Sequence, residues 1–389
     1  MPRSANALVN PDLLVWARES AAMEIEDAAR RLRVPPEKLR SWESGDPSPT
    51  VKQLLGMARL YRQSFAAFYL PTPPKVFKPP LTDYRVLPAG KTRKTSSGLW
   101  MDVREAMDRR AICLEFYGDR GESPPEFNAT ATISEEPEKV GETIRSLLEI
   151  QDSEQQRWGN PRIALNCWRE AIESMGVLVF QSTDIDLSEM RGYSLAAQPL
   201  PVIVVNRKDA YAARQFTLLH ELTHLMLHTS GLCDLEIGSG RRGAEHSTEV
   251  FCNHVAGAAL VPRALLLAEP VVKSHRGGVV WEDGELKSLA STYSVSREVI
   301  LRRLLIAGRT NQAFYQLKCE QFRREYERLP KREGFVPPSV DLVSAAGKPF
   351  VTMILNAYHD DRVTASDVSE YFGVKLKHLD KIHELVGLA

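Results

Sequence analysis

The stretch Gln215-Phe-Thr-Leu-Leu-His220-Glu221-Leu-Thr-His224-Leu-Met-Leu-His228 contains His-Glu-x-x-His inside a Leu-rich run without Pro or Gly. Such a run predicts an α-helix. Four residues turn a helix by roughly 400°, so His220 and His224 lie about 40° apart on one face, one turn apart along the axis. Both imidazoles can therefore reach one ion. Glu221 lies beside them as a carboxylate able to take a proton from metal-bound water.

A second stretch, Ser247-Thr-Glu249-Val-Phe-Cys-Asn253-His-Val-Ala-Gly-Ala-Ala-Leu-Val-Pro262, supplies a third ligand. Glu249 begins another predicted helix, and Asn253 lies one turn later on the same face. There Asn253 is placed to hydrogen-bond a ligating imidazole and fix its tautomer. The alternative is that His220, His224 and Glu249 are ordinary polar positions on amphipathic helices.

These residues also carry a resemblance to a known family. The run from Arg214 to His228, followed by Glu249-x-x-Cys-Asn-x-Val-Ala and Leu260-Val-Pro262, resembles the ImmA/IrrE family of metallo-endopeptidases. The similarity extends from about Gly176 to Pro262. It implies a zincin-like fold and cleavage of a partner repressor.

By motif position, the resemblance implies that His220, His224 and Glu249 are metal ligands and that Glu221 is the catalytic base. The implied metal is Zn²⁺, with Mn²⁺ as a second possibility. Cys252 stands where the family more often has Ala, a small substitution that affects no catalytic residue.

Composition limits the classes of protein that fit. The chain has 389 residues, enough for two or three domains, and its formal net charge is zero. No global field therefore draws it to nucleic acid or to a membrane. The five Cys show no Cys-x-x-Cys spacing, which suits a reducing compartment. No signal peptide or bilayer-spanning apolar run is evident, so we expect a cytoplasmic protein without a membrane partner.

Residues 1–70 predict a five-helix domain. The segments Ile25–Val34, Pro35–Gly45 and Pro49–Tyr61 read as successive short helices separated by turns. The ending Trp42-Glu-Ser-Gly45 resembles the Cro-like (XRE-type) helix-turn-helix module. This resemblance implies DNA binding and a homodimer.

The resemblance implies base contacts near Pro36, Glu37 and Ser41 on the second helix of the motif, which include neither Arg nor an amide side chain. Phosphates could be held by Lys38 and Arg40 together with Arg30, Arg31 and Arg33, but their charge is nearly balanced by the acids Glu24, Glu26, Asp27, Glu37 and Glu43. The alternative is a helical protein-interaction module on a DNA-binding scaffold.

The remaining chain divides into a Pro-rich linker at 71–96, a zincin-like metallopeptidase domain at 97–312 and a helical C-terminal extension at 313–389. Residues 176–181, 190–195 and 201–206 predict strands of a small sheet packed on the metal-site helix. An edge of that sheet could pair with an extended substrate. The predicted class is α+β, predominantly helical.

Peptide hydrolysis also needs a hydrogen-bond donor for the developing oxyanion. Tyr193, Tyr211, His228, His246 and His254 have suitable chemistry. For His228, a contact at the end of the site helix is the stronger interpretation.

Two hypotheses from different classes follow. The first is a zinc-dependent endopeptidase fused to a helix-turn-helix, which cleaves a repressor or toxin encoded nearby and so controls transcription. The second is a DNA-binding regulator, or the antitoxin of a toxin–antitoxin pair, that uses the metallopeptidase fold mainly to recognise its partner. The intact Glu221 favours the enzyme, because a pure binder would not need that carboxylate beside the metal.

Overall fold

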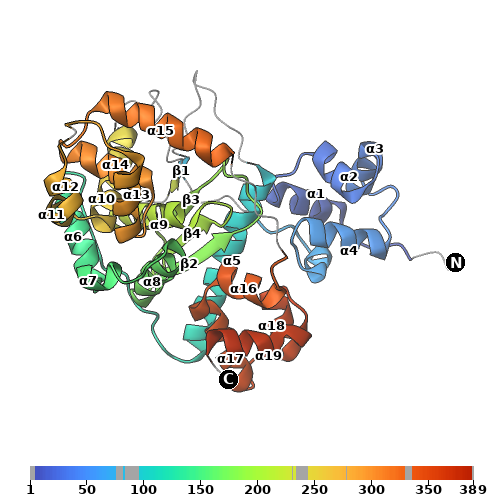
Figure 1. Cartoon of the computed structure of the whole chain (residues 1–389). Coiled ribbons are helices and arrows are strands. Elements are labelled where there is room, and N and C mark those ends of the chain that lie inside the picture. Colours follow the sequence, from blue (N-terminus) through green and yellow to red (C-terminus); the bar gives the residue numbers. More distant parts are fainter. Residues whose placement is uncertain are drawn as a thin grey trace. The chain divides into compact units, whose positions relative to one another are not determined.

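The computed structural model describes residues 5–75, 82–83, 96–229, 231–233, 244–276, 278–328 and 335–387 (Figure 1). The chain divides into two compact units: residues Met1–Pro80 with Arg93–Asp108, and residues Leu81–Thr92 with Arg109–Ala389. Both are mostly helical and the second holds a small sheet, consistent with the predicted α+β class. Among the described residues, no helix combines the length and apolar character that a bilayer crossing requires.

The first unit is a cluster of short helices. They are α1 (Pro11–Ser20), α2 (Ile25–Leu32), α3 (Pro36–Glu43), α4 (Val51–Leu60) and the 3₁₀ helix η1 (Phe65–Tyr69). Two starts follow directly from the sequence: Asn10 caps α1, and Thr50 with Gln53 forms a capping box on α4. Between residues 5 and 75 the structure thus has four α-helices and one 3₁₀ helix where five helices are predicted.

Helix α5 (Ser97–Asp119) contributes to both units, because its residues up to Asp108 cluster with the first. Met101 packs against the core of the first unit, and Arg104 donates hydrogen bonds to the carbonyl oxygens of Tyr61 (3.4 Å) and Arg62 (2.7 Å). This differs from the predicted domain start at residue 97, since helical periodicity does not say which core a helix joins. Of the predicted linker 71–96, residues 76–81 and 84–95 lie outside the described residues.

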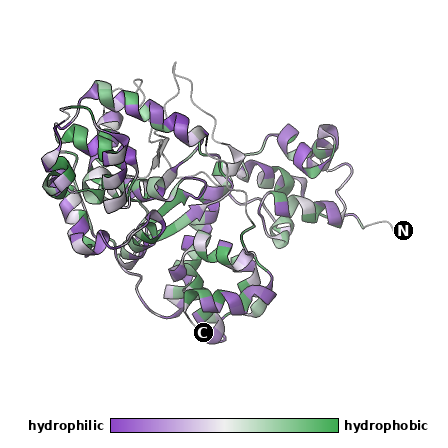
Figure 2. Ribbon diagram, in the orientation of Figure 1, coloured by the Kyte–Doolittle hydropathy of each residue, from purple (hydrophilic) through white to green (hydrophobic). Residues whose placement is uncertain are grey.

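A five-stranded sheet with the order β1-β5-β3-β4-β2 organises the second unit. Its strands are β1 (Thr82–Asp83), β2 (Leu178–Ser182), β3 (Gly192–Leu195), β4 (Val202–Asn206) and β5 (Gly231–Cys233). Strand β2 runs parallel to β4, whereas β3 runs antiparallel to both β4 and β5. Strands β2, β3 and β4 are buried along their whole length, and Figure 2 shows the hydrophobic character of β2 and β4. They correspond to the three predicted strands.

The two faces of the sheet carry different neighbours. Val179, Ile203 and Val205 belong to the core around α9 (Tyr211–Met226), the helix with the His-Glu-x-x-His pattern. Phe180 points to the opposite face, where its ring meets Phe350 edge-on at 6.2 Å. The site helix is buried from Arg214 to Met226, so its polar residues such as Gln215 and Glu221 are buried together with its apolar ones.

Further helices enclose α9 and fix its position. They are α6 (Pro137–Leu147), α7 (Asp152–Gln155), α8 (Pro161–Ser174), α10 (Ala244–Leu260), α11 (Arg263–Ala268), α12 (Pro270–Ser274), α13 (Asp283–Thr292), α14 (Arg297–Ile306) and α15 (Gln312–Glu327). Helix α10 packs on both α6 and α9. A Cβ at Gly141 would lie 2.7 Å from the Cβ of Ala258, so α6 and α10 approach this closely only because residue 141 is glycine.

The C-terminal helices pack on one another, and the first of them joins the others to strand β2. They are α16 (Pro338–Ala346), α17 (Lys348–His359), α18 (Ala365–Phe372), the 3₁₀ helix η2 (Leu376–His378) and α19 (Leu379–Val386). The carbonyl oxygen of Ser344 accepts hydrogen bonds from Arg169 (2.8 Å) and Gln181 (2.9 Å), which ties α16 to α8 and β2. The predicted boundary at residue 313 differs from this arrangement, because α15 packs on α14 and so joins the helices around α9.

A partly buried charge cluster joins α6, α10 and α14. Glu138 accepts two hydrogen bonds of 2.7 Å from Arg303, which is only 1% exposed, and lies 2.9 Å from Nε2 of His254. Burial alone would raise the pKa of Glu138, but the hydrogen bonds and charges of His254 and Arg303 outweigh it and lower the pKa to about 2. The ionised cluster therefore holds the helix that carries Glu249.

We predict that Glu138→Gln lowers the unfolding free energy near pH 7 by about 3–5 kcal/mol, because it leaves the Arg303 cation buried without its counter-charge. Since the folded pKa is lowered, this stabilisation is present above the unfolded carboxyl pKa of about 4.3 and disappears as the pH falls toward 2. Urea unfolding of metal-free protein at several pH values should show the gap between wild type and variant closing over that range.

The matched control is Glu320→Gln, which removes a carboxylate paired with Arg323 and Arg324 at the surface of α15. Solvent screens this pair, so its loss should change stability little. A constant gap between wild type and Glu138→Gln from pH 7 to pH 2 would contradict the assigned coupling.

Candidate metal centre

Three buried side chains from α9 and α10 converge at their ligand atoms. The Nε2 atoms of His220 and His224 are 3.1 Å apart. The carboxylate of Glu249 lies 3.5 Å from Nε2 of His220 and 3.2 Å from Nε2 of His224. The exposed fraction of each side chain is at most 1%. The predicted helical spacing thus brings both imidazoles to one point, and α10 delivers the carboxylate.

These separations fit a tetrahedral cation. In a zinc site with bonds of about 2.0–2.2 Å, neighbouring ligand atoms lie about 3.4 Å apart. The three closest separations here are 3.1, 3.2 and 3.5 Å. Among the described residues, His220, His224 and Glu249 form the one group of His, Cys, Asp and Glu side chains close enough to hold a metal ion.

The carboxylate of Glu249 is held in its ionised form. Its burial alone would raise its pKa, but the hydrogen bonds and charges of His220 and His224 outweigh that effect and set the pKa well below the usual range. A buried anion facing two imidazole nitrogens is a strong arrangement for a divalent cation.

Glu221 lies in the same buried layer, beside strand β3. It is fully buried on α9, between the two imidazoles in sequence. A Cβ at Gly192 would lie 2.4 Å from Cγ2 of Thr217 and 3.4 Å from Cγ of Glu221. The strand can therefore pass this close to Thr217, and so to the face of α9 that carries Glu221, only with glycine at residue 192.

A known family model matches the part of the chain that contains His220, His224 and Glu249. Residues 172–305 match the family model Peptidase_M78, described as the IrrE N-terminal-like domain. This region is similar to the ImmA/IrrE family. The match includes β2, β3, β4, α9, α10 and α14, and it supports a metallopeptidase-like domain there. Searches of curated proteins and of solved structures found no match.

Cys252 lies inside the IrrE-like region but outside the ligand group. It is fully buried in the core that includes α9 and α10. Burial, followed by the charges of Glu249 and Glu221, raises the pKa of its thiol well above the usual range. The thiol stays protonated, as expected for a small buried residue.

The predicted hydrogen bond from Asn253 to a ligating imidazole is not formed at His220. Within the described residues, Oδ1 of Asn253 and Nδ1 of His220 are both buried without a hydrogen-bond partner. At His224, Nδ1 instead lies 3.1 Å from Oγ1 of Thr229. Thr229 was not predicted from the sequence; the one local signal for it is its position three residues after Met226, the last residue of the site helix.

The pleat of β3 directs Tyr193 away from the metal centre. Gly192 faces α9, and successive residues of a strand point to opposite faces. Tyr193 pairs with Val204 and shares the face of Phe180. Among the predicted oxyanion donors, Tyr193 is therefore on the wrong side of the sheet.

The other predicted donors occupy different places. Tyr211 begins α9, about 14 Å from His220 along the helix axis, with the Arg214 guanidinium over its ring. His228 is exposed just beyond α9, and His254 pairs with Glu138. His246 lies one turn before Glu249 on α10, and its Nδ1 is buried without a partner in the described part of the chain. Of these five residues, His246 is the best placed.

The predicted DNA contacts lie on α3 in the first unit and make contacts within it. Arg40 forms a 2.5 Å ion pair with Glu26 and lies 3.9 Å from Glu37. Lys38 sits over the Trp42 ring at 5.6 Å. Ser41 donates a 2.8 Å hydrogen bond to the carbonyl oxygen of Lys38. The acidic residues that the sequence places near Arg40 thus pair with its guanidinium group directly.

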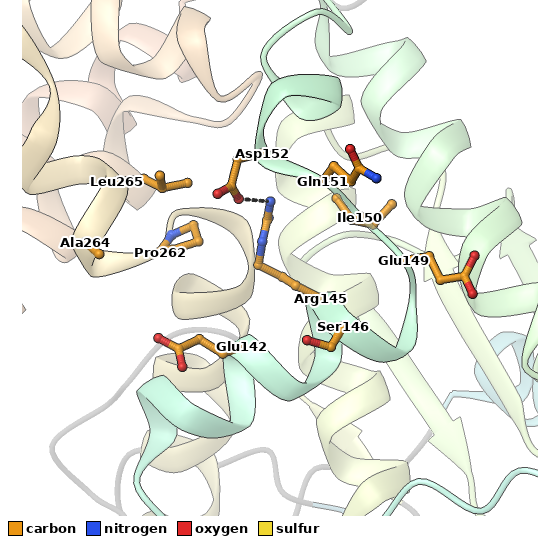
Figure 3. A pocket seen from close by; sticks show the side chains of 10 residues that line it. All are labelled: Glu142, Arg145, Ser146, Glu149, Ile150, Gln151, Asp152, Pro262, Ala264 and Leu265. Carbon is orange, nitrogen blue, oxygen red and sulfur yellow. Dashed lines mark hydrogen bonds and ion pairs between the residues drawn. The ribbon is translucent and has the colours of Figure 1, made fainter.

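A pocket of about 610 Å³ lies elsewhere in the second unit, between α6, the start of α7 and α11 (Figure 3). Arg145 and Asp152 point toward each other across it and form a 2.7 Å ion pair. Pro262 and Leu265 line the facing wall. No ligand of the metal centre lines this pocket.

We predict that Gly192→Ala lowers the unfolding free energy by about 1–3 kcal/mol, because the new methyl group would collide with Cγ2 of Thr217 at 2.4 Å and crowd the carbonyl oxygen of Val204 at 3.0 Å. The control is Gly284→Ala in α13, where a Cβ would meet nothing within 4 Å. That change should be neutral or stabilising, since Ala favours a helix over Gly. Chemical denaturation of both variants measures the difference; equal effects would contradict the close approach of β3.

Proposed function

We propose that this protein is a Zn²⁺-dependent endopeptidase that cleaves a protein partner, a repressor or another regulator, and so controls transcription. Mn²⁺ is the alternative ion. The observation that supports the proposal is the buried convergence of His220, His224 and Glu249, with Glu221 adjacent in sequence to the first of them. The IrrE-like match over the same residues adds to it. A cytoplasmic location is part of the proposal.

In this proposal His220, His224 and Glu249 hold the ion. A bound Zn²⁺ would lower the pKa of its water to about 7 and polarise the scissile carbonyl. Glu221 takes a proton from the attacking water and delivers it to the leaving amide nitrogen, so one water is consumed for each peptide bond broken. His246 would donate a hydrogen bond to the carbonyl oxygen.

Strand pairing next to the centre limits how a substrate can approach. Strands β4 and β5 pair with the two sides of β3, so β3 has no open side for an extended substrate while β5 is in place. Strand β2, at one end of the sheet, is contacted by α16. The proposal therefore assigns recognition to side chains around the centre rather than to strand addition at β3.

The competing hypothesis is a regulator or antitoxin that binds a partner through the same fold without cleaving it. The intact Glu221 beside the ligands favours the enzyme, because a pure binder would not need a proton-accepting carboxylate next to the metal.

We expect Glu221→Gln to bind the metal as wild type does but to lose cleavage by a factor of about 10² or more, because the amide cannot accept the proton. The full chain is incubated with Zn²⁺ or Mn²⁺ and with the repressor or toxin encoded beside it, and products are identified by mass spectrometry. Equal processing by both proteins would rule out the assigned base. Complex formation without cleavage by either protein would favour the binding hypothesis.

A second proposed function is DNA binding by the first unit. Helices α2 and α3 are joined by a three-residue turn in which Arg33 adopts a left-handed conformation, and Lys38 and Arg40 of α3 are exposed. This spacing and exposure suit a helix-turn-helix that lays α3 in the major groove. Homodimer formation would follow from the same resemblance.

We expect Arg40→Ala to weaken binding of the full chain to its operator and to reduce the salt slope by about one unit, since one phosphate contact is lost. Glu26→Gln should do the opposite, because it releases the Arg40 guanidinium from its intramolecular ion pair. Affinity is measured by fluorescence anisotropy at several salt concentrations. Affinities that neither substitution changes would favour a protein-interaction module.

A further inference from the structure

The end of the site helix is closed by a residue that also contacts a metal ligand. His228 has φ 54° and stands in the left-handed position that commonly follows a helix. The backbone N–H of the next residue, Thr229, donates a 3.0 Å hydrogen bond to the carbonyl oxygen of His224. This is the six-to-one bond of a Schellman motif, and it returns Thr229 to the turn that carries His224.

The side chain of Thr229 makes two further contacts with the same histidine. Its hydroxyl donates to the carbonyl oxygen of His224 at 3.0 Å, and its Oγ1 lies 3.1 Å from Nδ1 of the ring. A threonine hydroxyl has one proton and two lone pairs. With the proton on the carbonyl oxygen, Oγ1 presents a lone pair to Nδ1.

Metal ligation through Nε2 requires that the proton of a neutral imidazole reside on Nδ1. In the structure, Nε2 of His224 faces Nε2 of His220 and the carboxylate of Glu249, so Nε2 is the coordinating atom. The Nδ1–H of His224 then points at Oγ1 of Thr229. That oxygen can accept the hydrogen bond, because the Thr229 hydroxyl donates its own proton to the carbonyl oxygen of His224.

We infer that Thr229 is a positioning residue that accepts the Nδ1–H of His224, fixes its tautomer and holds its ring toward the metal. The inference rests on the proposed metal site and deepens it. The two functions of Thr229 are separable, because the backbone N–H closes the helix and the hydroxyl orients the imidazole.

The test compares Thr229→Val with Thr229→Ser. Valine keeps the shape and the backbone hydrogen bond but lacks the acceptor, whereas serine keeps the hydroxyl. Thr223→Val is the matched control, because it removes a buried hydroxyl from α9 itself. The hydroxyl of Thr223 donates a 2.8 Å hydrogen bond to the carbonyl oxygen of Leu219 and none to a histidine ring. Zn²⁺ affinity of the full chain is measured by competition with a chromophoric chelator, and the coordination geometry by the visible spectrum of the Co²⁺ form.

We expect Thr229→Val to weaken Zn²⁺ binding by about 10–100-fold and to change the Co²⁺ spectrum, since loss of a histidine's hydrogen-bond partner typically costs that much. Thr229→Ser should restore both, and Thr223→Val should leave both unchanged. Thermal unfolding of the metal-free proteins shows whether each variant is folded.

Wild-type affinity in Thr229→Val would overturn the inference. Equal weakening in Thr229→Val and Thr229→Ser, accompanied by lower metal-free stability, would also overturn it and assign Thr229 to the helix end alone. Failure of the wild-type chain itself to bind Zn²⁺, Mn²⁺ or Co²⁺ would instead reject the metal site, and with it the proposed function.

Discussion

The buried carboxylate of Glu249 is the constraint on which the second unit depends. Taking an ionised carboxylate out of water costs several kcal/mol unless positive charge and hydrogen bonds compensate it. The imidazoles of His220 and His224, at 3.5 and 3.2 Å, supply partners from α9. Neither helix can shift along the other without separating these groups, so the contact between α9 and α10 must be rigid.

The surrounding structure meets that requirement by close packing and by a partly buried charge cluster. Gly141 lets α6 lie directly on α10, and Gly192 lets β3 lie directly on α9. The Arg303–Glu138–His254 cluster then ties α10 to α6 and α14. The site helix is thus held from the sheet side by β3, and its partner helix by two further helices. This rigidity is what preorganised metal ligands require.

Much of this was predictable from the sequence, because the deciding signals are local. The His-Glu-x-x-His spacing places His220 and His224 on one helix face, and Glu249 belongs to the next strongly apolar helix, although α10 begins at Ala244 and not at Glu249 as predicted. The strands β2, β3 and β4 follow from β-branched runs between turns. Domain boundaries were less predictable: α5 is one continuous helix, and only tertiary contacts such as those of Met101 and Arg104 show that its first half joins the first unit.

The supporting residues of the centre depend on tertiary contacts and could not be read from the sequence. Asn253 has the right helical phase, yet its Oδ1 makes no hydrogen bond to His220, while Thr229 reaches His224 through the shape of a helix end.

Tyr193 shows most clearly which features of the centre the sequence could not predict. Every residue of β3 from Gly192 to Leu195 is buried, so alternation between polar and apolar residues, which normally reveals the two faces of a strand, carries no information there. The phase of the pleat is set instead by the single position that has no room for a Cβ. Gly192 must face Glu221, and Tyr193 must therefore face away from it.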